Sequence, residues 1–487
     1  MTLSIGIDIG TSAIKAVLLE SGNRLIAASS IELPSPIIDG PRVEQDPTDW
    51  LLATQDALKS LEESNPTEYA GVCAIGLSGQ MHGAVLIGED GFPLRHAILW
   101  NDSRSAAEAT ELDGLHPDFA MISGVPCASS FVAPKIAWLQ KHEPETIKQL
   151  RHFLLPKDYV RLWLTGEYAT DMSDAAGTWM FDQANRKWSK PILAAIGMNC
   201  EMLPALFEGP SITGTLRREV AEILGLRKGI VVAAGAGDAA ADAIGLGAIR
   251  DRDCIASIGT SCQLQVTTKE YRPEIADCIH AFAHGLPNLW YQMGAMLNGG
   301  SALAWWSAIC DKSPGQLIDE VSNKGGLHGA TLFLPCIAGE RTPHNDSAAA
   351  AAFSNIMLAA GRSDLTRAVL EGVAFTLADA KAAMQVSGTQ FDTISLIGGG
   401  SKSAVWAQII SDVLNVTIVR HDSSHSSAAV GAARLACLAK GRASIEDVCL
   451  KPPISASFEP NGQRPEGFET ALQKWHTLYK KTPELNA

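Results

Sequence analysis

Two short segments in opposite halves of the chain carry the same pattern of residues. Alternating apolar residues in Ile5–Ile9 and Ile14–Leu19 flank Gly10-Thr11-Ser12, and Cys254–Leu264 repeats this arrangement around Gly259-Thr260-Ser261. Apolar alternation on both sides of a turn with glycine and hydroxyl residues predicts a β-hairpin. The repeat therefore predicts an internal duplication, with a ligand-binding cleft between two halves of similar fold.

Strands and helices alternate along the rest of the chain. The clearest short apolar runs that predict strands are Gly71–Leu77, Ile230–Ala234, Ile394–Ile397 and Thr417–Val419. The apolar residues of Ser403–Leu414 recur with the period of a helix. Interleaved strands and helices favour an α/β fold. Small and charged residues in Ile244–Asp253 indicate a junction between an N-terminal domain, residues 1–249, and a C-terminal domain, residues 250–487.

The composition excludes several classes of function. The chain has 487 residues and a net charge of −14, which argues against non-specific binding of nucleic acid, because such binding depends on cations that neutralise phosphates. No segment approaches the run of about 20 apolar residues that spans a membrane. Ten scattered cysteines without a Cys-x-x-Cys pair are typical of a reducing compartment. We therefore expect a cytoplasmic protein that binds neither nucleic acid nor membrane.

The turns of the two predicted hairpins are candidate phosphate-binding sites. Asp8, Thr11, Ser12 and Lys15 place a carboxylate, two hydroxyls and a cation around the first turn, which suits a metal-bound phosphate. Gly259-Thr260 offers backbone amides and a hydroxyl at the second turn. An ordinary hairpin turn explains each segment taken alone, whereas two such turns in opposite halves favour nucleotide binding.

A third glycine-rich turn, Gly398-Gly399-Gly400-Ser401, lies between a predicted strand and the predicted helix of residues 403–414. Glycines at a strand-to-helix turn let a ligand lie on the backbone and leave the first amides of the helix free. A tight turn explains three glycines nearly as well.

Asp238 is the candidate general base. It stands alone among small residues in Gly235-Ala236-Gly237-Asp238-Ala239, directly after a predicted strand. A carboxylate with few competing partners and room for close approach suits removal of a proton from a hydroxyl. The structural alternative is a helix N-cap, because Asp is favoured at that position before an alanine run.

Polar residues beside a tryptophan suggest a site for a polyhydroxylated ligand. Met81 and His82 lie in Gly79-Gln80-Met81-His82-Gly83, and Trp100 precedes Asn101-Asp102. A loop histidine and a half-buried tryptophan are the ordinary explanation for each segment. The sequence contains no P-loop, no Gly-x-Gly-x-x-Gly fingerprint, no Gly-x-Ser-x-Gly elbow and no His-Glu-x-x-His zinc motif.

Taken in order, these motifs resemble those of the FGGY carbohydrate kinases, within the actin/hexokinase/heat-shock ATPase superfamily. Asp8–Ser12 and Ser257–Ser261 are similar to the two phosphate motifs of the family, and Gly398–Ser401 is similar to its adenosine motif. The more specific likeness lies in further segments, which are Gly79–Ala84, Leu99–Asp102, Leu155–Tyr159, Ser173–Thr178 and Gly339–His344.

The resemblance implies two ribonuclease-H-like domains that bind ATP and Mg²⁺ between them and phosphorylate a ketopentose at its terminal hydroxyl. By position it implies that Asp238 is the base, and that Asp8 and Asp238 lie at the metal. The implied sugar pocket contains Met81, His82, Trp100 and Asp238. The implied nucleotide site contains Thr260, Gly300, Gly400 and Ala404, to which the turns described above add Thr11, Ser12, Lys15, Gly259 and Gly399. The expected partners are the sugar and ATP, and a homodimer is left open.

One departure from the family pattern concerns the sugar. The family usually has Asn after the catalytic Asp, and this chain has Ala239. A side-chain amide for a sugar hydroxyl is therefore missing, so another pentulose or a polyol remains an alternative substrate. A non-catalytic ATPase-fold scaffold would keep the phosphate turns but would not need Met81, His82 and Asp238. A sugar-sensing regulator would need a DNA-binding domain before the first strand.

Overall fold

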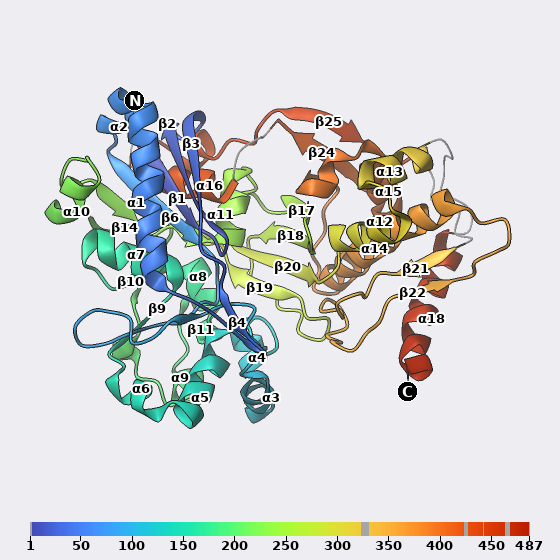
Figure 1. Cartoon of the computed structure of the whole chain (residues 1–487), viewed down its shortest axis with the longest axis horizontal. Helices are drawn as coiled ribbons and strands as arrows, with labels where there is room; N and C mark the ends of the chain where they lie inside the picture. Colours follow the sequence, from blue (N-terminus) through green and yellow to red (C-terminus); the bar gives the residue numbers. More distant parts are fainter. Residues whose placement is uncertain (1, 323–330, 423–426, 442, 463–467, 487) are drawn as a thin grey trace.

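The computed structural model describes residues 2–322, 331–422, 427–441, 443–462 and 468–486, which form two lobes, each built around a seven-stranded sheet (Figure 1). The path through the first sheet runs β14-β15-β6-β1-β2-β3, and β16 pairs with β6. Its strands are β1 Leu3–Ile9, β2 Ala13–Glu20, β3 Arg24–Glu32, β6 Ala74–Gly79, β14 Ile212–Thr215, β15 Val231–Ala233 and β16 Ala236–Gly237. The predicted first hairpin is confirmed, with Ile9 opposite Ile14.

The second sheet has the order β19-β20-β18-β17-β23-β24-β25. Its strands are β17 Cys254–Ile258, β18 Cys262–Thr268, β19 His280–Ala283, β20 Trp290–Met296, β23 Thr393–Ile397, β24 Thr417–His421 and β25 Ile454–Phe458. In each sheet three antiparallel strands are followed by two parallel ones, β3-β2-β1-β6-β15 and β20-β18-β17-β23-β24. The matching patterns confirm the predicted duplication and the α/β fold.

Helices cover both faces of the first sheet. The side chains of Ile5, Ile7 and Ile9 pack in one core with residues of α1, Pro47–Ser64, and α7, Pro156–Thr165. The alternate residues of a strand face the opposite side, where α16, Ser427–Ala439, lies on β1 and β6 and against α11, Asp238–Gly245.

Glycines permit this close approach. A Cβ atom on Gly6 would lie 1.9 Å from the Ala429 carbonyl oxygen, and one on Gly76 would lie 1.9 Å from that of Ala432. Helix α16 comes late in the sequence yet belongs to the first lobe in space, as its position among the blue strands shows (Figure 1). The predicted domains, residues 1–249 and 250–487, are continuous in sequence. Helix α16 belongs to the second of these ranges but packs in the first lobe.

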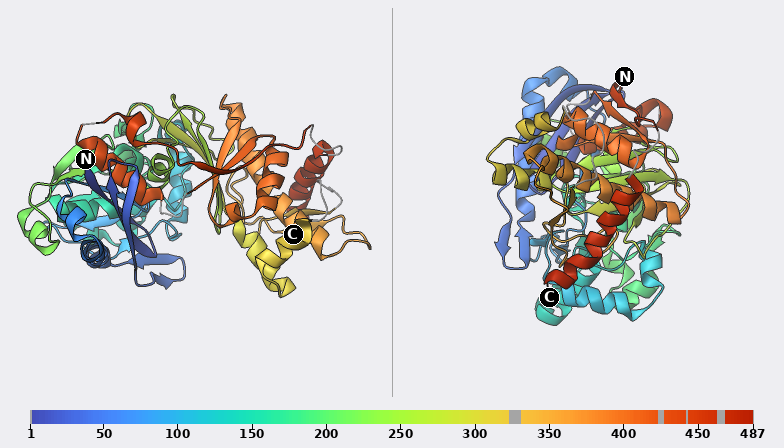
Figure 2. Two further views of the ribbon diagram at one scale, coloured as in Figure 1. Left: turned by 90° about the horizontal axis from the view of Figure 1, so that it is seen from above. Right: turned by 90° about the vertical axis from the view of Figure 1, so that its right-hand side faces the viewer.

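In the second lobe the core contains residues of β17, β18 and the helices α12 Gly300–Cys310, α13 Pro314–Ser322, α14 Arg362–Val386, α15 Ala404–Leu414 and α18 Phe468–Asn486. Helix α13 packs on α14. The last helix, α18, buries Trp475, whose Nε1 donates to the Phe333 carbonyl, so the C-terminal end lies on the second lobe, far from α1 (Figure 2).

Smaller elements extend the first lobe. They include β4 Ile37–Asp39, β5 Arg42–Gln45, β10 Ala169–Asp171, α3 Ala106–Leu115, α5 Val132–His142, α6 Pro144–Gln149, α8 Met172–Ala176 and α9 Lys190–Ala195. Among the described residues no helix combines the length and hydropathy that a membrane crossing requires.

Candidate active site

Met81 and His82 follow the end of β6, and the imidazole of His82 is held in one orientation. Its Nδ1 lies 2.6 Å from the carbonyl oxygen of Gly177, and its ring meets Phe131 edge to face. Burial lowers the pKa of His82 to about 3, so the ring is neutral at physiological pH. Because a carbonyl only accepts hydrogen bonds, Nδ1 carries the proton and Nε2 is left as an acceptor for a ligand hydroxyl.

Asp238 is the first residue of α11, at the end of the short strand β16. The N-cap position belongs to Gly237, so the capping alternative is wrong. One carboxylate oxygen, Oδ1, accepts the amide of Ala239 at 2.8 Å. Burial, together with the nearby charges of Asp8 and Asp242, raises the pKa of Asp238 to about 7. A carboxyl group with this pKa can accept a proton near neutral pH.

Two glycines leave room for the side chains that are predicted to bind the sugar. A Cβ atom on Gly177 would lie 2.8 Å from Nδ1 of His82, and one on Gly237 would lie 2.9 Å from Cγ of Met81. Met81 itself is buried. Met81 therefore lies against both Gly177 and Gly237, the residue before Asp238, whereas His82 lies against Gly177.

Trp100 lies beside the first hairpin turn. Its Nε1 donates to Oγ1 of Thr11 at 3.1 Å, and Thr11 donates to Oε1 of Gln80 at 2.9 Å. The indole is 43% exposed, so much of its surface is free to contact a ligand. Gln80 directly precedes Met81 in the chain. These contacts connect the candidate phosphate turn with the candidate sugar pocket.

Asp8 lies near the end of β1, paired with Lys15 in the hairpin register. Burial raises its pKa, against the opposing charge of Lys15, and its Oδ1 has no hydrogen-bond partner among the described residues. Ser12 and Lys15 are exposed at the same turn. A buried carboxylate oxygen without a donor is suited to a cation. In the described part of the chain no group of three or more His, Cys, Asp or Glu forms a complete metal site.

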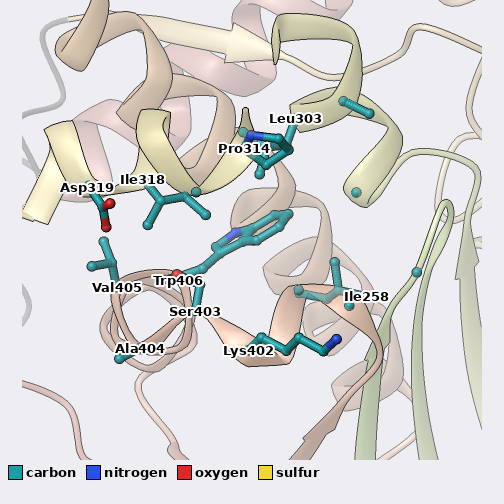
Figure 3. Close-up of a pocket in the computed structure, with 16 residues that line it drawn as sticks. Ile258, Leu303, Pro314, Ile318, Asp319, Lys402, Ser403, Ala404, Val405 and Trp406 are labelled. Atoms are coloured by element: carbon teal, nitrogen blue, oxygen red, sulfur yellow. Dashed lines mark hydrogen bonds between the residues drawn. The ribbon is translucent and has the colours of Figure 1, made fainter. Parts of the chain in front are cut away.

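A cavity of about 630 Å³ opens in the second lobe and contains five of the predicted nucleotide residues, which are Gly259, Gly300, Gly399, Gly400 and Ala404. Figure 3 shows it from inside, with Trp406 at the centre of the labelled side chains. Every residue of its lining belongs to the second half of the chain. Thr11, Ser12 and Lys15 are therefore not part of this cavity and lie on the other lobe.

The glycines of the cavity permit close backbone packing at the ends of strands. A Cβ atom on Gly300 would lie 2.6 Å from the Gly259 carbonyl, and one on Gly400 would lie 2.6 Å from Cγ2 of Ile258. The carbonyl of Thr260 accepts the amide of Ser301 at 3.1 Å, which joins the second turn to the start of α12. Two helices, α12 and α15, thus begin at the cavity, and helix N-termini attract phosphate groups.

The apolar walls of the cavity are residues that the sequence reasoning missed. Leu303, Pro314, Ile318 and Trp406 line it, from α12, α13 and α15 (Figure 3). Apolar walls of this kind suit a planar heterocycle. The amphipathic pattern of residues 314–322 was the available signal, but an amphipathic helix indicates only that one face is covered, not what covers it.

Comparisons with known proteins cover the whole chain. The model of the FGGY family of carbohydrate kinases, N-terminal domain, matches residues 3–245, and that of the C-terminal domain matches residues 254–440. A xylulose kinase of Escherichia coli strain K12 is 37% identical over 99% of this chain and 100% of the relative. One of Bacillus subtilis is 33% identical over 100% and 98%. A crystal structure of a xyloylose kinase from Brucella ovis has 40% identity and a TM-score of 0.96, over 99% of this chain and 100% of that one.

Proposed function

This chain belongs to the FGGY family of carbohydrate kinases, and we propose on that basis that it transfers the γ-phosphoryl group of ATP to D-xylulose, giving D-xylulose 5-phosphate. The observation that carries the proposal is the position of Met81, which lies beside His82 at Gly177 and also against Gly237, the residue before Asp238. The full-length likeness to xylulose kinases supports the choice of sugar. A coupled assay of ADP release with a panel of pentuloses and polyols tests it directly.

In this mechanism Asp238 acts as the general base. The terminal hydroxyl of the sugar gives its proton to the Asp238 carboxylate as its oxygen forms a bond to the γ-phosphorus of ATP. The bond from that phosphorus to the β,γ-bridging oxygen breaks, and ADP leaves. Phosphoryl transfer depends mainly on positioning and on neutralisation of charge. His82 and Met81 hold the sugar. Nε2 of His82 accepts a hydrogen bond from one of the sugar hydroxyls.

The cavity in the second lobe is suited to the nucleotide, and the two carboxylates are suited to Mg²⁺. The apolar walls would contact adenine, while the helix starts at Gly300 and Ala404 would bind phosphates. Asp8 and Asp238 would hold the metal together with phosphate oxygens, since Mg²⁺ in kinases is usually bound by one or two carboxylates and the substrate phosphates. The ion would neutralise charge on the transferred group.

The pH dependence of the reaction is predicted to report on Asp238. A base must be deprotonated to act, so activity is retained above the pKa of about 7 and lost as the pH falls through it. We expect kcat/KM for the sugar to fall about tenfold per pH unit below pH 7. Measurement between pH 5.5 and 8.5 at saturating ATP checks this, and a flat profile over that range would contradict it.

Ala239 is predicted to relax discrimination among pentuloses. Without this side-chain amide, the binding free energy of the preferred sugar is weaker on the order of 0.5–1.5 kcal/mol, or roughly 2- to 13-fold in affinity. We expect measurable D-xylulose phosphorylation and competing turnover of an epimer or deoxy analogue, and we expect Ala239→Asn to sharpen the preference. The sugar assignment fails if D-xylulose releases no ADP while another ketose or a polyol turns over well.

Closure of the two lobes is predicted to accompany substrate binding. The candidate nucleotide cavity lies in one lobe, whereas Asp8, Thr11 and Asp238 lie in the other. One triphosphate can reach both groups only if the lobes approach each other. Small-angle scattering should show a smaller radius of gyration with sugar and a non-hydrolysable ATP analogue than without them. An unchanged radius would count against closure.

A further inference from the structure

A buried group of charged residues lies behind the candidate base, and the proposed reaction does not use it. Lys157 contacts Asp158 Oδ1 at 2.6 Å, Asp171 Oδ2 at 2.8 Å and Asp174 Oδ2 at 3.1 Å, and all four side chains are fully buried. Arg161 lies 3.4 Å from the same oxygen of Asp158 and is equally buried. We call these five residues the Lys157 cluster.

The Lys157 cluster contains two cations and three carboxyl groups. Burial raises the pKa of Asp174 well above its ordinary value, against the opposing charge of Lys157, because desolvation disfavours the charged form. Lys157 and Arg161 compensate the charge of the neighbouring carboxyl groups, since an unpaired charge could not remain in the interior.

One side of the cluster holds the strand that leads to Asp238. Nη1 of Arg161 donates to the carbonyl of Ala233 at 2.8 Å and to Thr213 Oγ1 at 2.7 Å, and Nη2 donates to the carbonyl of Ala234. Ala233 is the last residue of β15 and Ala234 follows it, whereas Thr213 lies in the neighbouring strand β14. The entry to the segment that carries Asp238 is therefore fixed by two donated hydrogen bonds.

The other side reaches the residue next to Asp238. The backbone amide of Gly237 donates to Oγ of Ser173 at 3.1 Å. Ser173 in turn donates its hydroxyl proton to Oδ1 of Asp171, at 2.5 Å, and the same oxygen accepts the amides of Ser173 at 2.8 Å and Asp174 at 3.1 Å. The hydroxyl group of Ser173 thus has one orientation, because its proton points to Asp171 and a lone pair of its oxygen points to the amide of Gly237.

We propose that Ser173 is a positioning residue for the reaction, which fixes the backbone at Gly237 and so holds the Asp238 carboxylate at the acceptor hydroxyl. The proposal rests on the proposed role of Asp238 as the base. Among the hydrogen bonds of the described residues, that of Ser173 connects the Lys157 cluster to Gly237, the residue before Asp238, whereas Arg161 binds the carbonyls of Ala233 and Ala234, five and four residues before it. A displacement of about 1 Å in a catalytic group can lower turnover on the order of 100-fold.

The test compares Ser173→Ala, Ser173→Thr and a matched control, Ser123→Ala. Ser123 is also buried in the first lobe and donates to a backbone carbonyl, that of Phe119 at 2.8 Å, away from the segment of Asp238. We expect Ser173→Ala to lower kcat by about 10- to 100-fold with an unchanged KM for ATP. Ser173→Thr keeps the hydroxyl and should restore most of the turnover.

Turnover per sugar-binding site separates positioning from loss of folded protein. Sites are counted by calorimetry with D-xylulose, because Met81 and His82 lie in the first lobe, so unfolded molecules do not count. Ser173→Ala should bind the sugar and still show the lower turnover per site, and Ser123→Ala should keep the turnover of the parent enzyme. If Ser173→Ala does not fold, Ser173→Cys, which retains the size but accepts hydrogen bonds weakly, should lower turnover per site in smaller measure.

Two results would overturn the positioning role: turnover per site of Ser173→Ala equal to that of the parent enzyme, or lower turnover per site that Ser173→Thr does not restore. Asp238→Asn is measured in parallel. If Asp238→Asn is inactive and Ser173→Ala is unaffected, only the positioning role fails. If Asp238→Asn retains full turnover, the assignment of the base fails instead.

Discussion

Asp238→Asn is expected to lower turnover by about 10²–10⁴, which is the usual contribution of a general base. The amide has the shape of the carboxylate but cannot accept the proton of the acceptor hydroxyl at neutral pH. ATP binding should be nearly unchanged, because the cavity proposed for the nucleotide is lined by the second half of the chain alone and Asp8 remains to hold the metal. Steady-state turnover, measured beside the affinity for ATP by calorimetry, checks both parts.

Asp242→Asn is a suitable control for this variant, since Asp242 lies one turn later on the same helix and its charge contributes to the raised pKa of Asp238. We expect turnover at pH 8 within about twofold of the parent enzyme. The fall of kcat/KM for the sugar at acid pH should begin at a lower pH, because one of the charges that raise the pKa of Asp238 has been removed. Retained turnover in Asp238→Asn, or loss of ATP binding with it, would contradict the role of Asp238.

Lys157→Met is expected to destabilise the first lobe by about 3–5 kcal/mol, the range for removal of one partner from a buried ion pair. The substitution leaves the carboxylates of Asp158 and Asp171 buried with less compensation. With a shift of about 2–4 °C per kcal/mol for a unit of this size, the melting temperature should fall by roughly 6–20 °C. Thermal unfolding followed by circular dichroism measures the change.

Lys148→Met provides the comparison. Lys148 contacts Glu145 at 2.6 Å, but both side chains are largely exposed, at 69% and 76%. Exposed pairs contribute little, because water screens them and two long side chains must be ordered. Its melting temperature should therefore change by less than about 2 °C. Equal melting temperatures of Lys157→Met and the parent protein would contradict this prediction and show that the packing of Met compensates for the lost cation.

The features that the sequence predicted best depend on local pattern. The hairpin around Thr11, its counterpart around Thr260 and the helix that begins near Ser403 each lie within one short stretch, and the structure has them where expected. The approach of Met81 to Gly237 was suggested by family resemblance, because the two residues stand 156 positions apart and no local signal connects them.

The features that were missed depend on contacts between distant segments. Leu303, Ile318 and Trp406 form one wall, but they come from three helices whose apolar faces would suit any covered surface. Lys157 lies at the start of α7 and Asp171 at the end of β10, 14 residues later, so the sequence does not show that the two side chains are paired. Such pairings follow from topology, which local periodicity does not encode.

The position of α16 has a consequence for folding during synthesis. The first sheet and α11 are complete once residue 245 has been made, but the helix that covers β1 and β6 begins at residue 427. At about 5–20 residues per second, synthesis of the roughly 180 intervening residues takes on the order of 9–36 s. During that interval one face of the nascent sheet, with Gly6 and Gly76 at its centre, lacks its native cover. Although the sequence divides into two halves, the first half alone therefore leaves an apolar surface exposed on the ribosome for many seconds. A chaperone can bind that surface.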